Sequence, residues 1–279
     1  MAGIVVTAQE YLQDPAAVES RGHFRLRFLA EGDSWMDKSS VLGASLPHYL
    51  VQELDRRHVS ALIINLSHGG DTLRRMTDVM QGSLAWWLRQ FRYDALLFSA
   101  GGNDLIDACL DPDAGQGVLR DLRYSSPAQQ AQECVNQAAL TRLLDGYLAF
   151  NFSTIYTAMR SSLNASTPIF LNAYDTPTAR NAPVARGIGP WLYAAYRKNH
   201  IPEPLWPALT ALLFEALQNC IQQWCTGKAL VHCVPTTGVL QPASSTALGS
   251  SGDWANEIHP NARGWKKLAP IWADAILTD

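Results

Sequence analysis

Charged residues are scarce in this sequence, and neither sign dominates. They make up 17% of the 279 residues, against roughly 25% in an average globular domain. The net charge is −3 at pH 7, and the pairs Arg74-Arg75 and Lys266-Lys267 are isolated. A surface for nucleic acid or for an anionic membrane needs a concentrated basic patch. We therefore predict no nucleic-acid partner.

Long apolar runs and paired cysteines are also missing. No stretch reaches the ~18 apolar residues of a membrane span, and no basic segment precedes the short apolar run near the N-terminus. We therefore expect no membrane span and a cytoplasmic location, although export without a signal peptide would leave no trace in the sequence. The five cysteines lack the CxxC spacing of a zinc site, so we expect buried free thiols.

Five short apolar runs are present, and each is typical of a strand that is covered on both faces. They span residues 24–29, 61–66, 95–99, 168–173 and 229–234. Between them, apolar residues recur at spacings of three and four, as Leu205, Leu209 and Leu212 do, which predicts helices. Strands that alternate with helices favour a parallel sheet with right-handed crossovers. We therefore predict one α/β domain over residues 1–279.

Two of the predicted crossovers are long, at residues 105–167 and 175–205. In the first, Ser126-Pro127 with Gln129 has the pattern of a helix start and predicts a helix to about residue 150. The second is rich in proline, glycine and aromatic residues, and we expect Trp191 and Tyr196 to shape a pocket. Both follow strand ends at the edge where open α/β sheets bind ligands. Each is therefore a candidate lid or substrate wall, with a plain surface loop as the alternative.

Polar residues that suit ester chemistry follow the first three strands and recur near the C-terminus. Because the carboxyl ends of parallel strands meet at one edge of the sheet, the first three groups are expected to gather there. Gly32 allows a tight turn directly before Ser34. The four stretches are Gly32-Asp33-Ser34, Ser67-His68-Gly69-Gly70-Asp71, Gly101-Gly102-Asn103-Asp104 and Asp253-Trp254-Ala255-Asn256-Glu257-Ile258-His259-Pro260.

These residue types match the needs of ester or amide cleavage by a serine hydroxyl. The hydroxyl needs a base within hydrogen-bond reach, and His259 can act as the base for Ser34. The developing oxyanion needs N–H donors aimed at it. Gly70 can present a backbone N–H, Asn103 a side-chain N–H, and the N–H of Ser34 itself would be a third donor. A helix N-cap is the alternative role for Ser34.

On these four blocks the chain resembles the SGNH (GDSL) hydrolase superfamily, which is named for its Ser, Gly, Asn and His blocks. Here they are Ser34, Gly70, Asn103 and His259, in the family's order, and the resemblance covers about residues 24–272. It implies a flavodoxin-like three-layer α/β/α fold, with a five-stranded parallel sheet in the order 2-1-3-4-5 and Ser34 as nucleophile. Known members are esterases, lipases, thioesterases and carbohydrate acetylesterases, and none needs a metal or an organic cofactor.

The residue that would orient His259 departs from the family's pattern. The family usually has Asp three residues before the histidine, where this chain has Asn256. An amide oxygen can accept a hydrogen bond from the imidazole and hold its tautomer, but it brings no negative charge. Asp253 has the charge but reaches the ring only if the chain loops back, and Glu257 points away if the segment is extended. We predict Asn256 as the partner and Asp253 as its rival; a backbone carbonyl or a water is the remaining alternative.

Two classes of function follow from this pattern. The first is hydrolysis of carboxylic esters by an esterase, lipase or acetylesterase, through an acyl-enzyme on Ser34, with an acyltransferase as a variant. The second is a catalytically weak or silent relative that binds an acyl or glycan ligand, which Asn256 favours. A metal site at His68 and Asp71 is disfavoured, because no second His or Cys lies at ligand spacing. We expect a small-molecule, glycan or lipid ester as substrate and no cofactor; the sequence indicates no oligomeric state.

Overall fold

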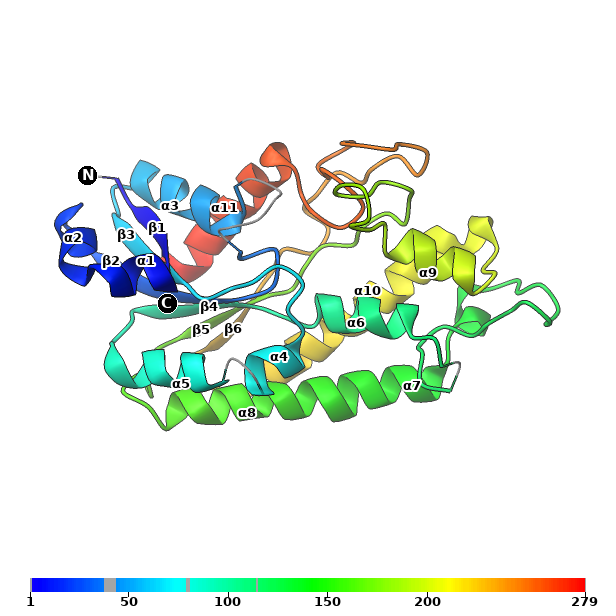
Figure 1. Ribbon diagram of the computed structural model, residues 1–279, viewed down its shortest axis with the longest axis horizontal. Coiled ribbons are helices and arrows are strands. Elements are labelled where there is room, and N and C mark those ends of the chain that lie inside the picture. Colours follow the sequence, from blue (N-terminus) through cyan, green and yellow to red (C-terminus); the bar gives the residue numbers. More distant parts are fainter. Residues whose placement is uncertain (1, 38–43, 79–80, 114, 279) are drawn as a thin grey trace.

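The computed structural model is organised around one parallel sheet (Figure 1). It describes residues 2–37, 44–78, 81–113 and 115–278. Within these residues the sheet has six strands, and every neighbouring pair runs parallel. In sheet order they are β1 (Ile4–Thr7), β3 (Ala61–Asn65), β2 (Leu26–Gly32), β4 (Ala95–Ser99), β5 (Ile169–Asn172) and β6 (Val231–Val234).

All five predicted strands are confirmed, and so is their order. Counted along the chain they are β2 to β6, and the sheet arranges them as β3-β2-β4-β5-β6, which is the order 2-1-3-4-5. The sheet has one strand more than predicted, because β1 pairs with the outer side of β3. Its four residues belong to the short apolar run near the N-terminus, for which no strand was predicted.

Helices cover both faces of the sheet and complete the three predicted layers. In Figure 1, α3 (Leu46–Arg56) and α11 (Ala262–Leu277) lie together above the sheet, and α5 (Gln81–Gln90) and α8 (Ala149–Arg160) lie below it. The other α-helices are α1 (Ala8–Gln13), α2 (Pro15–Ser20), α4 (Leu73–Asp78), α6 (Gly102–Leu110), α7 (Gln137–Thr141), α9 (Leu192–Lys198) and α10 (Trp206–Cys225). Short 3-10 helices span Ala131–Cys134 and Glu203–Leu205, and a π-helical segment spans Arg142–Leu148.

The central strands are buried on both sides, which explains their continuous apolar sequences. Successive strand side chains point to opposite faces, and neighbours such as Phe28 and Leu29 on β2 are both fully buried. The core therefore extends above and below the sheet. Among the described helices, none has the length and apolar character that a membrane crossing requires.

The first long crossover forms a helix that begins later than predicted. Its N-cap is Asn136, whose side-chain oxygen accepts a hydrogen bond from the N–H of Ala139 at 3.2 Å. From there it continues through the π-helical segment to the end of α8. The predicted start at Ser126 is wrong, because the preceding chain is held in turns: Glu133 accepts a hydrogen bond from the N–H of Gln129 at 2.9 Å.

The second long crossover lies beyond the carboxyl ends of the strands, where it contributes α9. This helix packs against α6, at the right of Figure 1. Trp191 precedes α9 and lies at a cavity, as expected. Tyr196 does not: it is fully buried, and its hydroxyl lies 3.0 Å from that of Thr210. The prediction for Tyr196 was wrong, because this face of α9 packs into the core.

Candidate active site

Ser34 stands on a tight turn at the carboxyl end of β2. Gly32 has φ +153°, and a β-carbon there would lie 2.4 Å from the carbonyl oxygen of Ser99, so only glycine fits. The carboxylate of Asp33 accepts hydrogen bonds from the hydroxyls of Ser99 (2.9 Å) and Tyr174. Burial raises the pKa of Asp33 to about 6, and the hydrogen bond from Tyr174 opposes the rise. Hydrogen bonds from Ser99 and Tyr174 thus hold the turn in place, and Ser34 lines the cavity.

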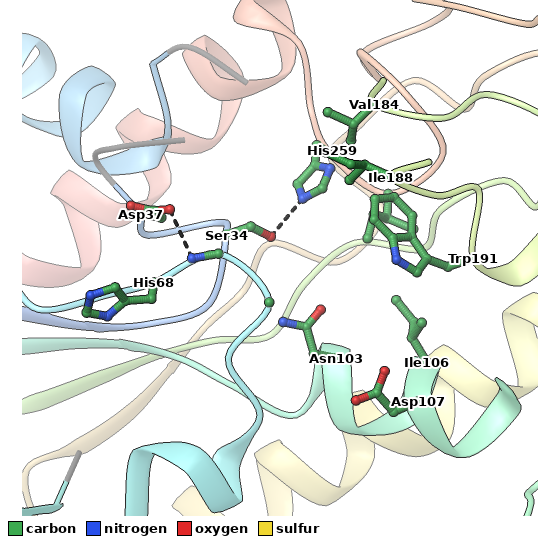
Figure 2. A pocket seen from close by; sticks show the side chains of 13 residues that line it. Ser34, Asp37, His68, Asn103, Ile106, Asp107, Val184, Ile188, Trp191 and His259 are labelled. Carbon is green, nitrogen blue, oxygen red and sulfur yellow. Dashed lines mark hydrogen bonds between the residues drawn. The ribbon is translucent and has the colours of Figure 1, made fainter. Parts of the chain in front are cut away.

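Ser34, His259 and Asn256 form a continuous hydrogen-bonded chain. Oγ of Ser34 lies 2.7 Å from Nε2 of His259, as Figure 2 shows, and Nδ1 of His259 lies 2.9 Å from Oδ1 of Asn256. The same Oδ1 accepts the backbone N–H groups of Ile258 (3.1 Å) and His259 (3.0 Å). These donors identify the amide oxygen, so Nδ1 must be the protonated ring nitrogen. Nε2 is therefore free to accept the hydroxyl proton of Ser34.

Burial keeps the imidazole of His259 neutral. The side chain is 4% exposed, and burial lowers its pKa to about 3. A neutral ring can accept a proton at pH 7. However, the partner on Nδ1 is an amide without charge, so it would stabilise an imidazolium less than the carboxylate of a catalytic triad does.

The structure places Asn256, and not Asp253, against His259. The Asp253 carboxylate pairs with the side chains of Arg263 and Lys267 and accepts the N–H of Gln241 at 2.6 Å. Burial raises its pKa, but the bonds from Lys267, Gln241 and Arg263 outweigh burial and keep the pKa below its usual value. Asp253 therefore anchors α11 and does not orient the histidine.

Gly70 and Asn103 line the same cavity as Ser34. Asn103 is the second residue of α6, and its Nδ2 donates one hydrogen to the carbonyl of Asp71 at 2.9 Å. A primary amide carries two N–H donors, so this bond orients the group and leaves its second N–H for a ligand. Gly70 has φ +84°, with nothing within 4 Å of where its β-carbon would be, so the conformation rather than lack of space favours glycine.

All four residues of the predicted set line one cavity of about 550 Å³ (Figure 2), a size typical of small-molecule sites. Nine lining residues were not predicted as site residues. Five are apolar or aromatic: Ile106, Val184, Ile188, Trp191 and Ile258. The other four are Asp37, His68, Gly69 and Asp107. Of these nine, Ile106 and Asp107 lie in the predicted segment 105–167, and Val184, Ile188 and Trp191 lie in the predicted segment 175–205. Both segments were anticipated as a possible lid or wall, but not by residue, because apolar lining has no sequence signature of its own.

His68 and Asp71 give no sign of a metal centre. Nδ1 of His68 lies 3.7 Å from Oδ2 of Asp71, and the His68 side chain is 61% exposed. In the part of the chain that the structure describes, no three His, Cys, Asp or Glu residues are grouped so that they could hold a metal ion.

Comparison with known proteins identifies one family. The model of the GDSL-like Lipase/Acylhydrolase family matches residues 30–267. No curated protein sequence matches the chain significantly. The lipase Lip_vut3 from a goat rumen metagenome has a TM-score of 0.55 and 11% identity, over 90% of this chain and 97% of its own. A protein described as a GDSL-like lipase, from Parabacteroides merdae, has a TM-score of 0.50 and 12% identity, over 92% and 97%. At such identities the structural likeness concerns the fold alone.

Proposed function

Because the chain belongs to the GDSL-like Lipase/Acylhydrolase family, we propose that it is a serine hydrolase that cleaves carboxylic esters through an acyl-enzyme on Ser34. One observation carries this proposal: the hydrogen-bonded chain from Ser34 through His259 to Asn256 ends at a cavity large enough for a small ester. A serine within hydrogen-bond reach of an oriented base is the arrangement that nucleophilic catalysis requires.

The first half of the reaction acylates the serine. Nε2 of His259 takes the hydroxyl proton as Oγ of Ser34 bonds to the carbonyl carbon of the ester. The carbonyl oxygen gains the negative charge and accepts hydrogen bonds from the N–H groups of Gly70, Asn103 and Ser34. When the tetrahedral intermediate collapses, the bond to the alcohol oxygen breaks, and His259 returns the proton to that oxygen.

The second half restores the enzyme. His259 removes a proton from water, whose oxygen attacks the acyl carbon. As the bond to Oγ of Ser34 breaks and the acid leaves, His259 returns the proton to Oγ. An alcohol in place of water would give acyl transfer. The apolar side of the cavity, which includes Ile188 and Trp191, suits the acyl part of the substrate.

A fluorophosphonate probe tests the proposal directly. We expect it to label Ser34, and His259→Ala to abolish the labelling, because an unactivated serine reacts poorly with such probes. Wild-type protein should also hydrolyse p-nitrophenyl acetate. A folded protein that shows neither labelling nor hydrolysis would instead support the catalytically silent ligand-binding alternative.

Loss of the Asn103 amide should lower the chemical rate more than substrate affinity. Asn103→Ala is expected to reduce kcat by about 10²–10³-fold, the usual cost of removing one oxyanion donor. KM should change less, because the donor acts mainly on the charge that develops in the transition state. Steady-state kinetics on p-nitrophenyl acetate measure both. A large rise in KM at constant kcat would make Asn103 a substrate-binding residue instead.

Trp191 should influence which acyl groups are accepted. Trp191→Ala removes an indole that lines the cavity, so we expect the preference among p-nitrophenyl esters of increasing chain length to change more than activity on the acetate. Tyr193→Phe is a suitable control, because it leaves a neighbouring aromatic ring in place. If the chain-length profile of Trp191→Ala equals that of wild type, residues 175–205 do not select the acyl group.

A further inference from the structure

Glu257 is fully buried, and its carboxylate accepts hydrogen bonds from a segment that lies far from it in the sequence. Its two oxygens accept backbone N–H groups that all belong to residues 180–193, which we call the substrate wall. Oε1 accepts from Arg180 (3.1 Å) and Tyr193 (2.7 Å), and Oε2 accepts from Trp191 and Leu192 (3.0 Å). Converging N–H donors on a buried carboxylate form strong, charge-assisted hydrogen bonds.

Two further bonds join the same two segments, one donated by each of them. The N–H of Glu257 donates to the carbonyl of Ala182 at 2.9 Å. The fully buried guanidinium of Arg180 donates from Nη2 to the carbonyl of Asn256 at 2.6 Å. The substrate wall is therefore tied to the loop that carries Asn256 and His259 by both side chains and backbone.

This attachment determines one side of the cavity. Val184, Ile188 and Trp191 of the substrate wall line it, and in Figure 2 their side chains lie on the His259 side of the cavity. The Trp191 ring packs edge-on against His259, with 5.8 Å between ring centroids and 73° between planes. Its backbone N–H is one of the groups that Glu257 holds.

We propose that Glu257 is a positioning residue that fixes the substrate wall and so sets which acyl groups the cavity accepts. It acts through the wall and is not the acidic partner of His259. This inference rests on the proposed function of the same site. Glu257→Gln is the sharpest variant, because an amide keeps the size of the side chain but turns one NH₂ group toward N–H donors that need an acceptor.

Kinetics and proteolysis test the role of Glu257 independently. In Glu257→Gln we expect the ratio of kcat/KM for p-nitrophenyl octanoate to that for the acetate to fall about tenfold, mainly through KM. Trypsin should cleave after the exposed Arg186 about tenfold faster than in wild type, because a loosened segment opens more often. Glu53→Gln is the matched control: Glu53 is also buried and bonds Arg57 at 3.0 Å, but on α3.

The outcomes separate the two proposals. An unchanged ester ratio with unchanged trypsin cleavage in Glu257→Gln would overturn the role of Glu257, and a proportional loss of kcat on both esters would assign it to His259 instead. If Glu257→Gln does not fold, Glu257→Asp retracts the carboxylate by one methylene and is tested in the same two ways. If the wild type hydrolyses neither ester, the proposed function fails, while trypsin cleavage still decides whether Glu257 holds the wall.

Discussion

Ser34→Ala is expected to lower kcat on p-nitrophenyl acetate by several orders of magnitude, up to the roughly 10⁶-fold seen when a catalytic serine is removed from a serine protease. The hydroxyl lies 2.7 Å from Nε2 of His259, and its removal takes away the nucleophile of the proposed acyl-enzyme. The remaining N–H donors and the cavity would leave a small residual rate. Activity of the purified variant and wild type, compared at equal concentration, measures the effect.

Correct folding of the Ser34→Ala variant must be shown alongside the loss of activity. Far-ultraviolet circular dichroism and thermal unfolding serve this purpose, and Ser45→Ala removes a different buried serine as a control. A folded Ser34→Ala protein that retains the wild-type rate would disprove the nucleophile assignment.

Asn256→Asp is expected to raise kcat at neutral pH by at least tenfold. The reverse change in the triad of a serine protease costs about 10⁴ in kcat, which sets the upper limit. Oδ1 of Asn256 already accepts hydrogen bonds from the ring and from two backbone N–H groups, so a carboxylate can occupy the same place. Its charge would stabilise the imidazolium of His259, which the amide cannot do.

The pH profile shows whether the gain arises at His259. The base must be neutral, so activity declines as pH falls through its pKa, which burial lowers to about 3 in the wild type. A carboxylate at position 256 favours the charged ring and should move this decline to higher pH. Asp253→Asn, which breaks the pairs with Arg263 and Lys267, should lower stability and leave the pH profile in place. If Asn256→Asp lowers kcat or does not move the profile, the amide is not the limiting partner.

Much of the fold was predictable because its signals are local. Apolar runs such as 61–66 and 95–99 are long enough to be seen, and strands covered on both faces require them. β1 has four residues, and they form a strand by pairing with β3. This pairing cannot be seen in the local sequence. The false helix start at Ser126 had the correct local pattern, but the chain there forms turns instead, in which Glu133 accepts a hydrogen bond from the N–H of Gln129.

The candidate site also has some residues that the local sequence predicts and others that only the structure identifies. Ser34, Gly70 and Asn103 are marked by residue type and position after strands, and His259 by residue type and its place in the C-terminal block. The structure gathers all four around one cavity. The separation of Asn256 from Asp253 needed the structure, because only there do Arg263 and Lys267 reach Asp253. Glu257 was ranked last as a partner for His259, and its attachment to residues 64–77 positions away leaves no trace in nearby sequence.

The hydrogen bond between Ser34 and His259 joins residues 225 positions apart in the sequence. This separation determines how a cut in the backbone affects the pair. A single backbone cut anywhere between them leaves the nucleophile and the base on separate fragments. A clipped molecule can then react only while the fragments stay associated through the sheet and the pairing of α3 with α11. Probe labelling of Ser34 would therefore report whether the two parts of the chain are assembled, cut or uncut, and it can be used to follow refolding or fragment reassembly without a substrate.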